Sequence, residues 1–186
     1  MRLLGFVLTL ILTAAAPPGA QAQDDRRLET DVKATFVYQF SRYTEWPPAI
    51  APAHRESPFK VCTVSDGAFD HSLDKVLEGE TFAGRPMVRK VPDGPQETRG
   101  CQILYIGDIE PERTKSLLAS VEGQPVLTVG DAPDFLKWGG QILLVRDGKR
   151  IRFDINLAAA RQNNIVLRSQ LLRIARTVLP DRGRMP

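Results

Sequence analysis

The feature that most constrains this chain is its alternation of short β-rich apolar runs with segments whose apolar residues have helical spacing. The β-rich runs are found at residues 59–64, 87–91, 101–106 and 125–129. Helical spacing follows the first run at residues 69–77 and the third run at residues 112–121. Since strands that alternate with helices form parallel sheets, the pattern predicts an α/β domain with a mostly parallel sheet flanked by helices.

The alternation ends in a hairpin pattern. Residues 141–145 and 150–155 have strand character and are separated by Asp147-Gly148, a strong signal for a two-residue turn. This pair predicts an antiparallel hairpin at the edge of the sheet. Asn156, which follows the second strand, is well suited to cap a short helix after it.

Two further helices are expected near the ends of the domain. Residues 28–43 form an amphipathic pattern after a polar lead at residues 23–27, and Pro47 stops the pattern. Residues 167–179 are predicted as a last helix, stopped by Pro180.

The N-terminus has the pattern of a secretory signal peptide. Arg2 precedes an apolar run at residues 3–16, and the triplet Ala-Gln-Ala ends at Ala22. The pattern predicts export from the cytoplasm with cleavage after Ala22, which leaves a single domain at residues 23–186. The alternative is an uncleaved N-terminal anchor.

The charge of the mature chain is nearly balanced. Loss of Arg2 with the signal leaves 24 basic and 22 acidic residues. Proteins that bind the phosphate backbone concentrate Lys and Arg on one face, so this balance argues against nucleic acid as the main partner.

Cys62 and Cys101 are the two cysteines of the chain. An oxidising compartment favours a disulfide between them, and with two cysteines a single intramolecular connectivity exists. Two buried free thiols or an intermolecular bridge remain as alternatives.

Residues typical of catalysis are scarce. His54 and His71 have no second ligand at metal-binding spacing, and no nucleophile elbow or phosphate-binding loop is found. Gly139-Gly140 is more typical of a helix end than of a cofactor loop. We therefore expect a protein that is not an enzyme, with no catalytic residue, metal site or cofactor.

Two groups of residues are candidates for binding. Arg150 and Arg152 share one strand face with Asp154 and are candidate ligand-binding residues; the alternative is a solvated face with cross-strand ion pairs. The candidate partner-binding residues are aromatic or basic and lie near the end of the first helix and near the C-terminus: Tyr43, Trp46, Arg168, Arg173 and Arg176. A solvated basic face and a tryptophan lid over the edge of the core are the alternatives.

Several segments, in order along the chain, resemble the YfiR family of periplasmic regulators. The opening segment is KATFVYQFSRYTEWP at residues 33–47. The later segments are residues 61–64, residues 127–129 with Phe135 and Gly139-Gly140, residues 152–156 and residues 169–172. The resemblance covers nearly the whole mature chain.

The resemblance implies a Rossmann-like α/β domain, commonly dimeric, that represses an inner-membrane diguanylate cyclase by contacting its periplasmic sensor region. It also implies release by an outer-membrane lipoprotein or by a redox change, with higher cyclic diguanylate and more biofilm as the result. Cys62 and Cys101 lie where the family has its fold-maintaining disulfide. The second cysteine pair of some members is missing here, so a redox switch built on that pair does not transfer.

Two function classes follow. The first is repression of a diguanylate cyclase by protein contact, through a shift in the population of cyclase conformations. The second is a periplasmic small-molecule binding domain that uses the carboxyl ends of the parallel strands.

Overall fold

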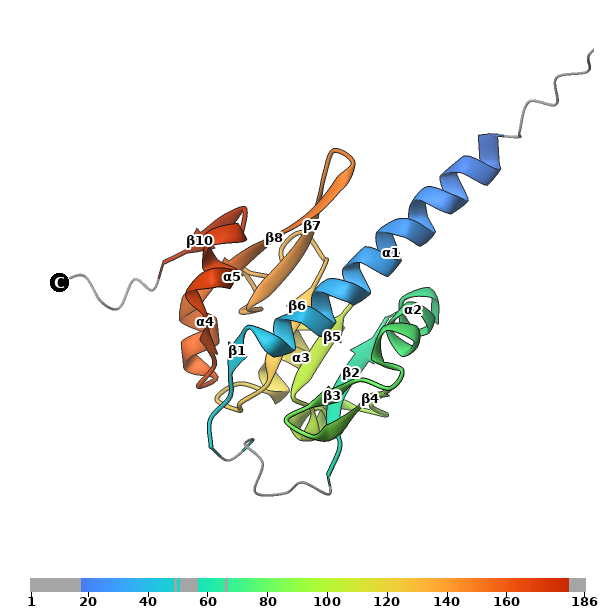
Figure 1. Cartoon of the computed structure of the whole chain (residues 1–186). Helices are drawn as coiled ribbons and strands as arrows, with labels where there is room; N and C mark the ends of the chain where they lie inside the picture. The colour runs from blue at the N-terminus through green and yellow to red at the C-terminus, as the bar shows by residue number, and fades with distance from the viewer. Residues whose placement is uncertain (1–17, 49, 51–56, 66, 181–186) are drawn as a thin grey trace, which may run out of the picture.

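The computed structural model describes residues 18–180 except 49, 51–56 and 66, with side chains from residue 23 onward. Within these residues, helices cover both faces of one eight-stranded sheet of order β10-β8-β7-β6-β5-β2-β4-β3 (Figure 1). The elements in chain order are α1 (Pro18–Arg42), β1 (Thr44–Glu45), β2 (Phe59–Val64), α2 (Gly67–Leu77), β3 (Thr81–Phe82), β4 (Arg85–Lys90), the 3-10 helix η2 (Pro95–Gly100), β5 (Ile103–Ile106), α3 (Pro111–Ser120), β6 (Leu127–Gly130), β7 (Ile142–Asp147), β8 (Arg150–Asn156), α4 (Leu157–Gln162), β9 (Val166–Leu167), α5 (Ser169–Ile174) and β10 (Thr177–Leu179).

The sheet has the mostly parallel arrangement that the alternating pattern predicts. Strand β2 pairs in parallel with β4 on one side and with β5 on the other, and β5, β6 and β7 follow in parallel order. The chain therefore reverses its direction of winding between β2 and β5. The predicted hairpin is confirmed, because β7 and β8 pair antiparallel from Ile142–Ile155 to Asp147–Arg150, and Gly148 adopts a φ of +61° in the turn.

The predicted helix at residues 167–179 is wrong at both ends. Leu167 belongs to β9, which pairs with β1, and the helix is limited to Ser169–Ile174. Thr177, Val178 and Leu179 form β10, parallel to β8. β-Branched residues suit a strand, and here the edge of β8 supplies the partner. The hairpin therefore lies near one edge of the sheet, with β10 outside it.

The first helix also differs from the expectation. Helix α1 begins at Pro18 rather than near residue 28, because the polar residues 23–27 continue the helix with their side chains exposed. Proline is well tolerated in a first helical turn. Residues 1–17 of the predicted signal peptide lie outside the described residues, and the cleavage after Ala22 stays a prediction.

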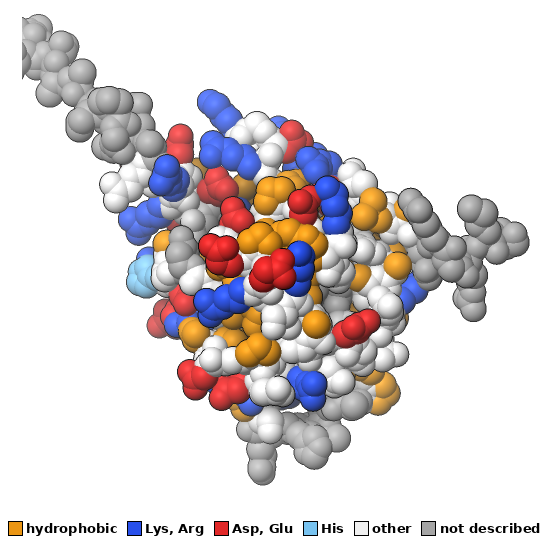
Figure 2. Space-filling model, turned by 180° about the vertical axis from the view of Figure 1, so that it is seen from behind, with side chains coloured by type: hydrophobic (Ala, Val, Ile, Leu, Met, Phe, Trp, Pro, Cys, Tyr) orange, Lys and Arg blue, Asp and Glu red, His pale blue; other side chains and the backbone are white. Residues whose placement is uncertain are grey.

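Two apolar clusters fill the two faces of the sheet. Helices α1 and α2 pack on one face, where the ring of Phe153 in β8 lies 5.1 Å from Phe40 and 5.6 Å from Phe36 between centroids. Helix α3 covers the other face, with Leu117 and Leu118 buried there. Figure 2 shows the molecule from behind, where hydrophobic side chains lie among basic and acidic ones.

Candidate partner-binding surface

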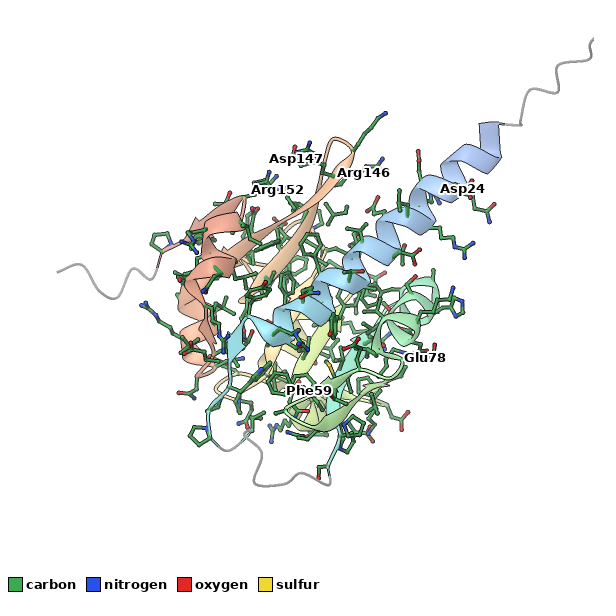
Figure 3. The ribbon with its side chains drawn as sticks, viewed as in Figure 1. Asp24, Phe59, Glu78, Arg146, Asp147 and Arg152 are labelled. Carbon is green, nitrogen blue, oxygen red and sulfur yellow. A yellow bond between two sulfur atoms is a disulfide. The ribbon has the colours of Figure 1, made fainter. Side chains whose placement is uncertain are left out.

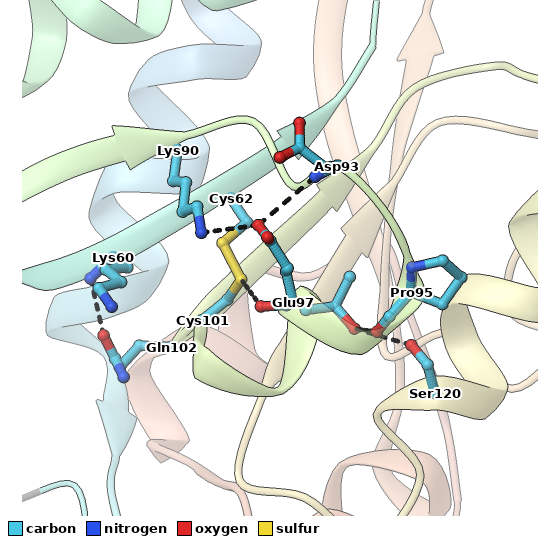
Figure 4. Close-up of a disulfide and its surroundings, with 10 residues drawn as sticks. Lys60, Cys62, Lys90, Asp93, Pro95, Glu97, Cys101, Gln102 and Ser120 are labelled. Atoms are coloured by element: carbon cyan, nitrogen blue, oxygen red, sulfur yellow. Dashed lines mark hydrogen bonds and ion pairs between the residues drawn. A yellow bond between two sulfur atoms is a disulfide. The ribbon is translucent and has the colours of Figure 1, made fainter.

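The structure contains the expected disulfide between Cys62 in β2 and Cys101 just before β5. The two Cα atoms are 5.8 Å apart, and the side chains are buried, with 0% and 1% exposure. Next to the bond, Gln102 N donates to Lys60 O at 2.9 Å, and Lys60 N donates to Gln102 Oε1 at 2.7 Å (Figure 4). This position inside the sheet gives the bond a role in the fold.

A surface ion pair lies beside the disulfide. Lys90 Nζ lies 2.7 Å from Glu97 Oε2 (Figure 4). The hydrogen bond from Lys90 lowers the pKa of Glu97 below its ordinary value. Both side chains are largely in solvent, so the pair adds little to stability.

Trp46 lies over the edge of the core, as the lid interpretation proposed. Its ring is 5.4 Å from Phe59 and 6.4 Å from Phe82 between centroids. Its indole Nε1 donates to Ser41 O at 3.2 Å. Because the ring and the indole N–H already have partners, Trp46 is less available to a partner protein than the sequence suggested.

Tyr43 and Arg168, distant in sequence, are brought together by the structure. Strand β1 follows Tyr43, β9 precedes Arg168, and the two strands pair antiparallel. Arg168 N donates to Tyr43 O at 3.0 Å, and the Tyr43 side chain stays 37% exposed. The end of α1 therefore meets the start of α5, which carries Arg173 on its exposed side.

Arg176 lies apart from this group. Its guanidinium pairs with Asp154, with Nε 2.9 Å from Oδ1, and these hydrogen bonds raise the pKa of Arg176. Side chains alternate along β8, so Asp154 points away from the face where Phe153 meets α1. The ion pair joins β8 to the residue that precedes β10, and it holds the buried Asp154.

Arg150 and Arg152 lie at the hairpin end of β8, where Figure 3 labels Arg152 together with Arg146 and Asp147. Arg150 and Arg152 alternate onto the same face of β8 as Asp154, and Arg150, next to the turn, also borders the hollow beside α1. These two candidate ligand-binding residues therefore share one strand face.

An apolar groove lies between α1 on one side and β8 and α5 on the other. It has a volume of about 370 Å³ and no charged side chain in its lining. The lining residues are Val32, Thr35, Phe36, Gln39, Phe40, Tyr43, Phe153, Leu171 and Ile174. Ile174 is 58% exposed, which is unusual for so large an apolar side chain next to other apolar groups.

The groove continues toward the β7–β8 turn. A second hollow of about 670 Å³ shares Val32 and Phe36 with the first and is lined further by Leu28 and Ile151. Leu28 is 65% exposed. We call the two hollows together the α1 groove; it runs along one flank of α1 from Leu28 to Tyr43.

Sequence reasoning found the Tyr43 end of the α1 groove but missed its length. Leu28, Val32 and Phe36 recur every four residues along α1, and the same spacing leads on to Phe40, which is buried together with Ala34 and Val37. An apolar face of this width is a signal that the helix packs against more than one element.

The crevice at the carboxyl ends of the parallel strands, the usual ligand site of such sheets, is occupied by side chains of the protein itself. Lys33 of α1 lies 2.9 Å from Asp131 and 3.0 Å from Glu29, and Tyr105 Oη donates to Asp131 at 3.0 Å. Arg146 binds Glu29 at 3.1 Å. Burial lowers the pKa of Lys33, but the hydrogen bonds and charges of Asp131 and Glu29 outweigh it and raise that pKa.

Among the described residues, no group of three or more His, Cys, Asp or Glu side chains is placed to hold a metal ion. No helix in that part of the chain has the length and apolar character needed to cross a membrane.

The family model described as YfiR/HmsC-like matches residues 30–176. It defines a class of periplasmic regulatory proteins, and the match covers β8, α5 and the part of α1 from Thr30 onward, which line most of the α1 groove. This chain belongs to the YfiR/HmsC-like family, as the resemblance in sequence predicted.

Two solved structures are similar at low identity. A crystal structure of a conserved domain protein from Vibrio cholerae has 13% identity and a TM-score of 0.45. The ABC domain in complex with L-Trp from Streptococcus pneumoniae has 12% identity and a TM-score of 0.47. Each match covers 71% of this chain and 57% of the other chain, so this chain spans little more than half the length of either.

Proposed function

We propose that this protein is a periplasmic regulator that represses an inner-membrane diguanylate cyclase by protein contact, with the α1 groove as the contact surface. The observation that carries the proposal is an open apolar groove whose two ends expose Leu28 and Ile174. Large exposed apolar surfaces of this kind mark interaction sites. Tyr43 at the same groove is a residue type enriched among interface anchors.

The mechanism is a shift in population. A repressor that binds the inactive cyclase conformation more tightly than the active one lowers the active fraction by that difference in affinity. An outer-membrane lipoprotein that binds the repressor more tightly than the cyclase does would release the cyclase. Homodimer formation is a further part of this proposal and draws its support from the family.

The alternative, a domain that binds a small molecule at the carboxyl ends of the strands, has less support. Lys33, Asp131 and Tyr105 occupy that crevice with hydrogen bonds to one another. A ligand there would have to displace a partly buried ion pair, at a cost of about 3 kcal/mol or more.

Cyclic diguanylate measured in cells tests the proposal. Deletion of the gene is expected to raise it, and a plasmid copy carrying Ile174→Glu should fail to restore the low level. Val91→Glu serves as the matched control, because Val91 is 53% exposed and lies outside the α1 groove. Unchanged cyclic diguanylate in the deletion strain would exclude repression of a cyclase.

A further inference from the structure

The α1 groove also indicates what kind of element binds in it. We propose that its occupant is an amphipathic helix of a partner protein, about four turns long, with acidic residues at the ends of its apolar stripe. This inference rests on the proposed function for the identity of the partner, but the binding chemistry can be tested without it.

The backbone around the groove favours a helix over an extended peptide. The floor at Phe153 belongs to β8, which pairs with Leu144 of β7 on one edge, while Phe153 O accepts a hydrogen bond from Arg176 N at 2.8 Å on the other. The remaining walls are the helices α1 and α5. An extended peptide would find no strand edge along this central part, whereas a helix satisfies its own backbone hydrogen bonds and needs only side-chain contacts.

The length of the groove sets the length of the helix. From Leu28 to Tyr43 the groove follows α1 for roughly 22 Å, at ~1.5 Å per helical residue. A partner helix of the same length presents apolar side chains at positions i, i+3 or i+4, and i+7 along one stripe. Leu28 and Ile174, exposed at opposite ends, would contact the first and last of these.

The charges at the ends of the α1 groove predict the charge of the polar residues on the partner helix. Lys149 and Arg150 rim the hairpin end, and Arg173 is adjacent to Ile174 at the other end. Among the described residues, none of these three cations has a carboxylate within ion-pair distance. The two carboxylates of the lining are Asp25 and Glu29, and Glu29 is already held by Lys33 and Arg146. Of the described side chains, the three unpaired cations at the ends of the groove outnumber the one unpaired carboxylate, that of Asp25. Acidic side chains of a partner helix therefore fit at these ends better than basic ones.

Three stapled peptides of about 18 residues, roughly 27 Å as helices, test the inference by fluorescence anisotropy with the mature protein. The first has a leucine stripe at helical spacing with glutamates elsewhere, the second has lysines in place of the glutamates, and the third has the composition of the first with leucines at every second position. The first peptide is expected to bind at least about tenfold more tightly than the other two, because only it combines the stripe with the complementary charge. Equal binding of all three, or no binding, would overturn the inference.

Variants locate the binding. Leu28→Glu and Ile174→Glu should each weaken the acidic helix at least about tenfold, as expected for anchor positions. The combined change of Lys149 and Arg173 to Glu should reverse the preference toward the lysine peptide. Val91→Glu and Arg113→Glu, an exposed charge reversal on α3, are the controls and should change the affinity less than about twofold. Loss of binding in the controls as well would refute the placement in the groove.

Two other occupants are outcomes of the same test. If Ile174→Glu dissociates a dimer in light scattering while the acidic helix binds as before, the groove accepts a second copy and the inference is wrong. If vesicles of phosphatidylglycerol bind through Leu28 and Lys149 while no peptide does, the occupant is a lipid surface and the inference is again wrong. The cell experiment tests the proposed function independently of the helix site. If the acidic peptide binds but deletion of the gene leaves cyclic diguanylate unchanged, the helix site is supported and repression of a cyclase is excluded.

Discussion

Removal of the disulfide gives the clearest quantitative test of how this fold is stabilised. In the oxidised protein, the bond between Cys62 and Cys101 closes a loop with a sequence separation of 39 residues. The double variant Cys62→Ala/Cys101→Ala removes the cross-link and leaves no free thiol, since the described residues contain no unpaired cysteine. Both positions are buried, and alanine fits where cysteine was.

The expected loss follows from the entropy of the unfolded chain. Closing a loop of this length lowers the entropy of the unfolded chain by roughly 13 cal/mol/K, which corresponds to about 4 kcal/mol of stability at 25 °C. For a domain of this size, each kcal/mol lowers the melting temperature by about 2–4 °C, so the variant should melt roughly 8–16 °C below the oxidised wild type.

Circular dichroism and calorimetry under oxidising and reducing conditions check this. Wild type in reductant should melt close to the double variant, and reductant should leave the variant unchanged. If the oxidised wild type and the variant melt within about 2 °C of each other, loop closure does not stabilise this fold as the chain-entropy argument requires.

Three other predictions concern single positions. Lys33→Met should lower the melting temperature at neutral pH, because the pKa of Lys33 is raised in the folded state. The contribution of Lys33 to stability is complete below its unfolded pKa near 10.5 and is lost as the pH rises through its folded pKa. The melting temperatures of variant and wild type should therefore converge in alkaline buffer. Asn156→Ala removes the hydrogen bond that the Asn156 Oδ1 accepts from Ala159 N at 3.1 Å. Chemical denaturation should show a free energy of unfolding lower by about 1 kcal/mol at constant m-value. An unchanged free energy of unfolding would mean that another group caps the helix. Mass spectrometry of protein from the periplasm should find Gln23 at the N-terminus, and a full-length cytoplasmic species would contradict export.

The separation of the predicted partner-binding residues shows where residue-type arguments lose resolution. Tyr43, Trp46 and Arg176 were grouped because aromatic and arginine side chains dominate interfaces. In the structure Tyr43 borders the α1 groove, Trp46 packs on Phe59, and Arg176 pairs with Asp154. Each residue type is also used inside the fold, and only the neighbours decide which use applies.

Features that depend on residues close together in the chain could be predicted without the structure. The alternation of strands and helices predicted the parallel sheet, Asp147-Gly148 predicted the hairpin, and two cysteines left a single intramolecular pairing. These signals are local because side-chain periodicity and turn conformation depend on a few adjacent residues.

The tertiary structure decided what depends on segments far apart in the chain. Residues 177–179 became a strand because β8 offered an edge, although their own pattern continued a helix. The α1 groove exists because α1, β8 and α5 converge from three parts of the chain and leave the stripe at Leu28, Val32 and Phe36 without a full cover. Helical spacing shows that a stripe is apolar, but whether it is buried or left open for a partner depends on the elements that pack beside it.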